Sequence, residues 1–274
     1  MKTKTQRGQM KDLTDPKKGL HQHKDHVQLE FMAKQTTQIL HHLDDLIAST
    51  ESFAPNPVKP YKLSHKDRQD LNHPPRFREI HWEEALWRGR ERLTGDTVAG
   101  AWDEIVGLQE LLNRRQDANG WGEVDVLAKS NNLPVVVEIK SKASERLLRA
   151  TLEAVAYGIA LKRAWPVLRF QWAERTGAAI SKPYLACYPL VVAAPTSTYW
   201  RKVIPATDAT PGRDQPAVEF WSPFYKLLQA LNERGLPLQF LAIETNGHDE
   251  QCGLPNITSL KKVVFVESGL PKIL

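Results

Sequence analysis

The sequence predicts an α/β fold, a β-sheet flanked by helices. Apolar residues recur at spacings of three and four in some segments and alternate with polar residues in others. These segments follow one another as helix, three strands, helix, strand, helix and strand, which is the order of an α/β core. Hydrophobic residues make up 41% of the 274 residues, enough to fill such a core.

The N-terminal part differs in composition from the rest. Residues 1–24 are polar and basic with no apolar period, and we expect a disordered arm there. From Asp25 to about Ser49 the apolar spacing predicts a helix, and the five prolines of residues 52–76 predict an extended linker. We therefore expect a helical N-terminal extension over 25–76 and the main domain over 77–274. The apolar face of the extension is a candidate dimer or partner surface, or it packs on its own core.

The first half of the main domain opens with a helical pattern from Ile80 to about Val106, with a break near Gly95. We expect a first strand over 107–115, although the segment LQELLN could also prolong the helix. The Asn-Gly pair of DANGWG indicates a turn. The strands GEVDVLAK (122–129) and VVVEIKSK (135–142) follow.

The second half continues the alternation. A helix is expected from Ser144, a plausible N-cap, to about Ala164, with Pro166 just beyond its end. The segment 184–194 is strand-like, and Pro223–Arg234 has the pattern of a short amphipathic helix closed by Gly235. Two more strands are expected over 238–244 and 261–268.

Charge and cysteine content narrow the class of protein. The net charge of +5 mildly favours a polyanionic partner. Cys187 and Cys252 give neither a disulfide framework nor a metal-ligand pairing, which fits a reducing, cytoplasmic setting. No segment approaches the roughly 20 apolar residues of a membrane span, so no membrane partner is expected, and the basic N-terminus lacks the apolar stretch of a signal peptide.

Charged residues interrupt the most apolar strand of the sequence. In VVVEIKSK, Glu138 and Lys140 point together from one face. Asp125, on the neighbouring strand GEVDVLAK, could approach Glu138. Two close carboxylates repel unless a cation lies between them, and Mg²⁺ favours such oxygen ligands. Lys140 could then hold a water or stabilise charge developing on a phosphate. The alternative is an exposed polar face with ion pairs across the strands.

The segments GEVDVLA and VVVEIKSK, with thirteen positions from Asp125 to Glu138, resemble the PD-(D/E)XK nuclease superfamily, and in particular its Holliday-junction-resolvase-like members. The resemblance covers about residues 97–165 and implies a restriction-endonuclease-like core, in which helices flank a mixed central β-sheet in the order αβββαβ. It also implies a Mg²⁺ site, for which Mn²⁺ can substitute, that hydrolyses phosphodiesters.

By this resemblance, Asp125 and Glu138 would be metal ligands together with the Ile139 carbonyl, and Lys140 would be the catalytic lysine. Many members add a glutamate from the preceding helix. Glu104 is the first candidate because it lies one short strand upstream. Three further glutamates stay open for this position: Glu91, Glu110 and Glu123.

Basic residues around the motif are candidates for contact with nucleic acid. Lys142, Arg146 and Arg149 follow the motif, and Arg114 and Arg115 precede it. On the following helix Arg149, Glu153 and Tyr157 share one face. Nuclease branches that act on DNA ends often carry Gln-x-x-x-Tyr there. Glu153 stands where Gln would be, and the alternative is that Tyr157 packs while Arg149 and Glu153 form a surface pair.

These inferences predict a metal-dependent deoxyribonuclease, and the size fits a role in restriction, phage defence or mobile-element processing. The alternative is a catalytically silent nuclease-like module that binds nucleic acid or assembles with a partner. A homodimer is compatible with the resemblance, since two strands need two sites. The sequence has no P-loop and no zinc-finger spacing, so energy input or recognition would come from a partner ATPase or recognition subunit, or from the N-terminal part.

Overall fold

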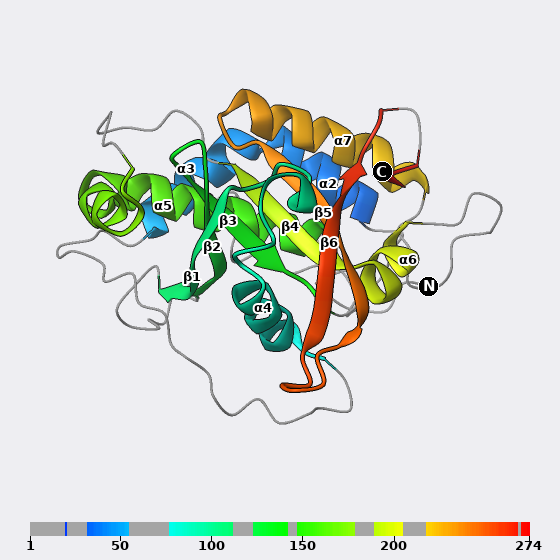
Figure 1. Ribbon diagram of the computed structural model, residues 1–274. Coiled ribbons are helices and arrows are strands. Elements are labelled where there is room, and N and C mark those ends of the chain that lie inside the picture. The colour runs from blue at the N-terminus through cyan, green and yellow to red at the C-terminus, as the bar shows by residue number, and fades with distance from the viewer. Residues whose placement is uncertain are drawn as a thin grey trace.

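Seven strands form one mixed, curled sheet in the computed structural model of the protein (Figure 1). The structure describes residues 20, 32–54, 77–111, 123–141, 147–178, 189–204, 218–267 and 270–274. The strands are β1 (Glu104–Leu111), β2 (Glu123–Ser130), β3 (Leu133–Ile139), β4 (Leu190–Pro195), β5 (Leu238–His248), β6 (Pro255–Val264) and β7 (Lys272–Ile273). They lie side by side in chain order. The three central strands, β3 to β5, run parallel, and the other neighbours pair antiparallel.

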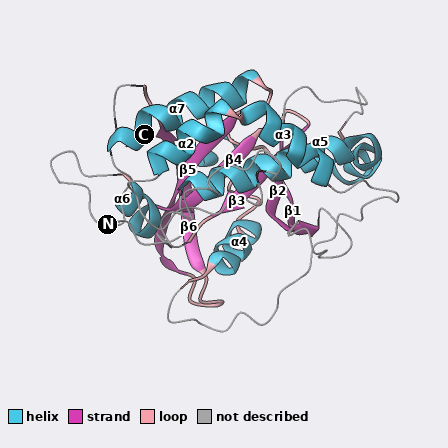
Figure 2. Cartoon of the chain, turned by 180° about the vertical axis from the view of Figure 1, so that it is seen from behind, coloured by secondary structure: helices cyan, strands magenta, loops and turns pink. Residues whose placement is uncertain are grey.

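Helices cover both faces of this sheet. The helices are α2 (Met32–His41), α3 (Leu43–Phe53), α4 (Glu79–Arg88), α5 (Leu147–Thr176), α6 (Arg201–Val203) and α7 (Val218–Glu233), with short helical turns η3 (Gly95–Val98) and η4 (Thr196–Trp200). Figures 1 and 2 show α2, α3, α5 and α7 on one face and α4 on the other. The prediction of an α/β fold is confirmed. Among the described helices, none is long and apolar enough to cross a membrane.

The alternation of strand residues divides the core into two clusters. On the α5 side, Val136 and Val192 pack with the helices α2, α3, α5 and α7. On the α4 side, Val135 and Val137 pack with Trp82 of α4 and with β5 and β6. Because β3 is covered on both faces, it is apolar almost throughout, as expected for a central strand in parallel pairing.

The N-terminal helices belong to the main core. Met32, Ile39, Leu43 and Leu46 of α2 and α3 are fully buried in the cluster on the α5 side. The apolar face that we considered for a dimer or partner contact is therefore covered by the protein itself. The expected arm and most of the linker lie outside the described residues.

The helix expected over 80–106 is much shorter in the structure. α4 ends at Arg88, and η3 and turns follow before β1 begins at Glu104, three residues earlier than expected. Gly95, Ala99 and Gly100 all adopt positive φ, a conformation that no α-helix accommodates. The helix thus ends seven residues before the break expected near Gly95, and no α-helix resumes before β1.

The helix expected to stop before Pro166 continues through it. α5 runs for 30 residues to Thr176 with Pro166 in its interior, where the proline removes one helical hydrogen bond. Packing outweighs that loss, because Leu168 and Trp172 beyond the proline are buried in the core. The Trp172 indole also donates a hydrogen bond to the Asn132 carbonyl, at 3.2 Å.

The last elements begin earlier than the sequence indicated. α7 begins at Val218 and carries Pro223 in its interior, and β6 begins at Pro255 rather than near Lys261. β5 is confirmed from Leu238 and extends to His248. β6 also ends at Val264, earlier than the range 261–268 expected for it, so that strand is shifted as well as lengthened, and the order of the elements is unchanged.

Candidate active site

The end of the β2–β3 pairing brings two carboxylates together. The last backbone pair of the two strands is Val126 with Val137. One residue further, Asp125 of β2 lies opposite Glu138 of β3, and both side chains point to the same face of the sheet. The approach of these two residues, expected from the sequence, follows from this register.

The Asp125 side chain accepts a hydrogen bond that a backbone carbonyl of β2 would otherwise accept from β3. The Ile139 N–H donates to Asp125 Oδ2 at 2.7 Å instead of to β2 backbone. The N–H and the C=O of one strand residue point to the same side, so the Ile139 carbonyl is directed toward β2 as well. The site thus has two carboxylates and one backbone carbonyl at the point where the strands separate.

Glu138 has one oxygen in a hydrogen bond and one without. Its Oε1 accepts from Lys140 Nζ at 2.7 Å. Its Oε2 is buried and has no hydrogen-bond partner in the part of the chain that the structure describes. A buried carboxylate oxygen without a partner costs free energy, so such atoms usually have a functional reason.

Lys140 is surrounded by carboxylates from three different elements. Its Nζ lies 2.7 Å from Glu138 of β3, 3.2 Å from Glu153 of α5 and 3.4 Å from Glu79 of α4. The side chain is 8% exposed. The ammonium therefore lies where the helices on the two faces of the sheet meet the end of β3.

The sequence reasoning missed two carboxylates of α4. Glu79 pairs with Lys140, and the charge of Glu83, a buried residue, acts on Asp125. The two residues stand four apart on α4 and so share one face of the helix, although like charges at this spacing destabilise a helix. That spacing was the available signal, but the predicted helix began at Ile80, one residue after Glu79.

Burial and mutual repulsion shift the pKa values of this cluster. Burial, and then the charge of Glu83, raises the pKa of Asp125 well above its usual value. Burial, and then the charge of Asp125, does the same for the pKa of Glu138. For Lys140, burial alone lowers the pKa, but the carboxylates outweigh it and the pKa is raised. The cluster is short of positive charge, as expected of a site that binds a cation.

Glu104 does not take the role that we expected of it. Its carboxylate pairs with Lys129 at 2.6 Å. Lys129 is four residues beyond Asp125 on β2, which places Glu104 about 13 Å away at the rise of an extended strand. The residue opens β1 because the strand starts earlier than predicted, and it faces solvent at that end of the sheet.

The structure also describes the other three glutamates that were candidates for completing the site. Glu91 is exposed in the turn after α4, and Glu110 is paired along the backbone with Val124. Glu123 lies two residues before Asp125 and is half-buried on the same strand face. Of these three, Glu123 alone keeps a position near the cluster.

The residues expected to contact nucleic acid are only partly described. Arg149 donates to Glu153 Oε1 at 2.7 Å from Nε, so the predicted helix face does form an Arg–Glu pair, next to Lys140. Tyr157 is half-buried on the same face. Burial, and then the charges of Glu138 and Glu153, raises the pKa of Tyr157. Four further candidates lie outside the described residues: Arg114, Arg115, Lys142 and Arg146.

A divalent cation at this position would have few ligands from the protein. Within the described ranges, no group of three or more His, Cys, Asp or Glu side chains is arranged to hold a metal ion. Mg²⁺, however, is usually held by one or two carboxylates, with water and substrate phosphate filling its other positions. Asp125, the partnerless oxygen of Glu138 and the Ile139 carbonyl fit that mode.

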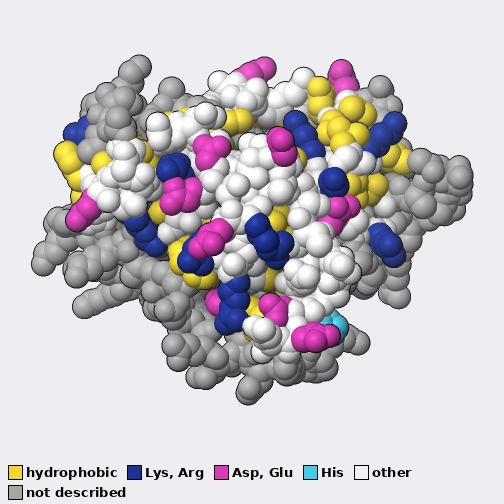
Figure 3. Space-filling model, in the orientation of Figure 1, with side chains coloured by type: hydrophobic (Ala, Val, Ile, Leu, Met, Phe, Trp, Pro, Cys, Tyr) yellow, Lys and Arg dark blue, Asp and Glu magenta, His cyan; other side chains and the backbone are white. Residues whose placement is uncertain are grey.

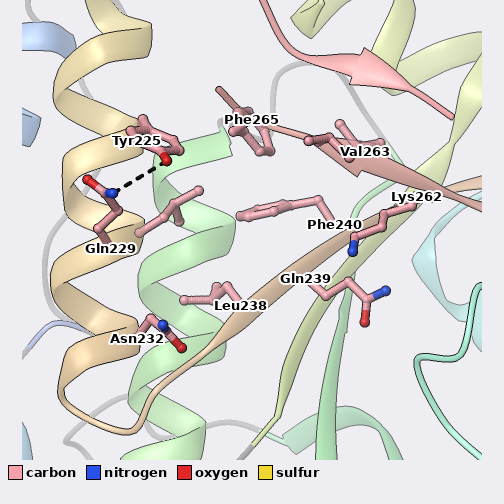
Figure 4. A pocket seen from close by; sticks show the side chains of 11 residues that line it. Tyr225, Gln229, Asn232, Leu238, Gln239, Phe240, Lys262, Val263 and Phe265 are labelled. Atoms are coloured by element: carbon pink, nitrogen blue, oxygen red, sulfur yellow. Dashed lines mark hydrogen bonds between the residues drawn. The ribbon is translucent and has the colours of Figure 1, made fainter. Parts of the chain in front are cut away.

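Two other surface features do not resemble a catalytic site. A hollow of about 260 Å³ lies between α7 and the strands β5 and β6 (Figure 4). Its described lining is mainly apolar and amide side chains, with Lys262 as the charged residue and no carboxylate. On the face seen in Figure 3, Lys and Arg side chains are interspersed with Asp and Glu rather than gathered in one patch.

Comparison with known proteins gives no relative. No family model matches the chain, and no curated protein and no solved structure is significantly similar to it. The function is therefore argued from the site alone.

Proposed function

We propose that the protein is a metal-dependent nuclease that hydrolyses DNA phosphodiester bonds, with a site of the PD-(D/E)XK type. The observation that carries the proposal is Glu138. This buried carboxylate faces Asp125, has one oxygen without a partner within the described ranges, and accepts from Lys140 with its other oxygen. Glu84 of α4 also has a buried Oε2 without a partner among the described residues, but it pairs with Arg88. Glu138 differs because it lies beside Asp125 and shares Lys140 with two further carboxylates, an arrangement that a bound cation would complete.

The order of elements supports this proposal. α4, β1, β2, β3, α5 and β4 follow one another as one helix, three strands, a helix and a strand. This is the αβββαβ order implied by the resemblance of GEVDVLA and VVVEIKSK to that superfamily. The positions of Asp125 on β2, of Glu138 near the end of β3 and of Lys140 directly after β3 support the proposal.

Asp125, Glu138 and the Ile139 carbonyl would hold Mg²⁺, or Mn²⁺ in its place. The bound ion supplies positive charge that lowers the pKa of a water and offsets the charge of the phosphate. The protein's own contribution is to hold these ligands. The Ile139 N–H fixes Asp125 by its Oδ2, and the Lys140 ammonium fixes Glu138 by its Oε1.

Lys140 would act on the substrate directly. Its ammonium stays charged, because the surrounding carboxylates raise its pKa. From its position beside Glu138, Nζ can donate a hydrogen bond to a phosphate oxygen on which charge develops. Glu83, on the face of α4 toward Asp125, takes the place that we expected for Glu104 as the glutamate of the preceding helix.

Cleavage assays test the proposal. Labelled plasmid, linear duplex, single-stranded and branched DNA are incubated with Mg²⁺, Mn²⁺ or EDTA. The wild type is compared with Glu138→Ala and Lys140→Ala, and with Glu84→Ala as a control for the loss of a glutamate of α4 outside the cluster. We expect metal-dependent cutting that Glu138→Ala and Lys140→Ala abolish and Glu84→Ala retains.

One outcome of these assays would contradict the nuclease proposal. If the wild type cuts none of these substrates with either metal but binds DNA, and both site variants bind equally well, the protein is not a nuclease. The binding-module alternative would then hold, and a partner ATPase or recognition subunit would be sought. The substrate that is cut best identifies strandedness and endo- or exonucleolytic action.

A further inference from the structure

The Lys140 ammonium also contacts a residue outside the metal-binding motif, Glu153 of α5. Of the three carboxylates around Nζ, Glu138 is itself a proposed metal ligand, and Glu79 is the most distant, at 3.4 Å, and 31% exposed. The third carboxylate, Glu153, lies 3.2 Å from Nζ, and its side chain is 18% exposed. It is not a proposed metal ligand, and it is more buried than Glu79.

Glu153 is held in turn by Arg149. The Nε and Nη2 atoms of Arg149 lie 2.7 Å and 2.6 Å from Glu153 Oε1. Lys140 contacts the other oxygen, Oε2. Each oxygen of Glu153 thus serves one cation, and the side chain cannot turn without breaking one of the two contacts. Arg149 and Glu153 lie one turn apart on α5, so the helix fixes both ends of the pair.

We infer that Arg149 and Glu153 form a positioning pair, which holds the Lys140 ammonium at a fixed distance from Glu138 and so keeps it directed at the scissile phosphate. Without Glu153, the ammonium, which already lies 2.7 Å from Glu138, would turn further toward Glu138 and Asp125, the carboxylates that the cation needs. This inference rests on the proposed function. It assigns Glu153 a role that depends on both of its oxygens.

The requirement for two oxygens makes Glu153→Gln the decisive substitution. The amide keeps the size of the side chain but has one acceptor oxygen, so it can serve Lys140 or Arg149 and not both. Because the pair acts on the position of Lys140 and not on DNA binding, we expect kcat to fall about tenfold to a hundredfold while KM for DNA changes little.

A double-mutant cycle tests the link between the two residues. Arg149→Ala should lower kcat in the same way. The double variant should be no slower than Glu153→Gln, because both substitutions disrupt the same contact between Glu153 and Lys140 and their effects are not additive. If instead Arg149→Ala raises KM and the two effects multiply, Arg149 contacts DNA independently and the inference is overturned. Glu84 and Arg88, a pair at the same spacing on α4 with 3.0 Å between Arg88 Nε and Glu84 Oε1, supply the matched control cycle.

A readout that needs no cleavage separates this inference from the proposed function. The ¹H–¹⁵N signal of the Lys140 ammonium, assigned by its loss in Lys140→Arg, should shift or broaden in Glu153→Gln and not in Glu84→Gln. If the wild type cuts no DNA but this response is seen, the nuclease proposal fails and the positioning pair stands. If cutting is metal-dependent but neither the signal nor kcat responds to Glu153→Gln, the positioning pair is overturned and the nuclease stands.

Discussion

Glu138 near the end of β3 and Lys140 directly after it form an ion pair of 2.7 Å, and the other carboxylate oxygen is buried with no partner among the described residues. A buried carboxylate oxygen without a hydrogen bond costs free energy, and here two further carboxylates, Glu79 and Glu153, lie around the same ammonium. The pair is therefore better explained by a ligand that completes it. Four predictions follow from this site and its surroundings.

Divalent cations should stabilise the folded protein. Binding to Asp125 and Glu138 occurs only in the folded chain, and at a hundred times Kd it adds about 2.7 kcal/mol. For a protein of this size the melting temperature should rise by about 5 °C or more. Differential scanning fluorimetry with Mg²⁺ and Mn²⁺ measures this shift. Asp125→Asn should remove it, and an equal shift in that variant would place the ion elsewhere.

In the absence of metal, Asp125→Asn should make the protein more stable. Burial, and then repulsion between carboxylates, raises the pKa values of Asp125 and Glu138 above their usual 3.8 and 4.5, so the folded state retains protons that the unfolded chain releases. Stability with EDTA therefore falls as the pH rises from about 4 through the raised pKa values. The variant should lose less, with a gain of about 1 kcal/mol at pH 7.

Urea unfolding of both proteins in EDTA, at several pH values between 4 and 8, checks this expectation. The gain of Asp125→Asn should grow with pH and vanish near pH 4. A variant that is less stable than the wild type at every pH would show that Asp125 is held by its hydrogen bond to Ile139 more than it is strained by its neighbours.

Glu83 and Glu104 should differ sharply in their effect on cleavage. The charge of Glu83 acts on Asp125, whereas Glu104 pairs with Lys129 far from the cluster. Glu83→Gln should lower kcat about tenfold to a hundredfold, the usual range for residues that support a metal site. Glu104→Gln should cleave like the wild type. The reverse order in steady-state kinetics would return Glu104 to the site.

Lys140→Arg should be inactive despite the retained charge. The ammonium is a compact donor among three carboxylates, and the longer planar guanidinium cannot occupy the same position. We expect a loss of about a hundredfold or more in kcat, as for other donors that stabilise developing charge. Thermal stabilisation by Mg²⁺ should persist, because the ion is held by other residues. Loss of both would show that the substitution disturbs the ligands themselves.

Much of the site could be predicted because it lies on two adjacent strands. Period-two alternation places Asp125 and Glu138 on one face, and the short turn between β2 and β3 makes the strands neighbours. Both inferences need only local sequence. The fold class was equally accessible, since each strand and helix carries its own periodicity.

The contributions of the helices could not be predicted in the same way. Glu79 precedes Lys140 by 61 positions, and Glu83 precedes Asp125 by 42. Both glutamates reach the cluster only because α4 packs across the end of the sheet. In the sequence, a glutamate pair one turn apart is typical of a solvated helix face. Likewise, Pro166 predicts a helix end, and only the buried Trp172 beyond it shows why α5 continues.

The two faces of the sheet have one further consequence. Lys140 is held by α4 from one side and by α5 from the other, on a strand that itself needs β4 as its neighbour. No short fragment of the chain contains all of these parts in place. If the proposed nuclease activity is present, a chain still on the ribosome would acquire it only after Glu153 and the strands beyond it have emerged and docked.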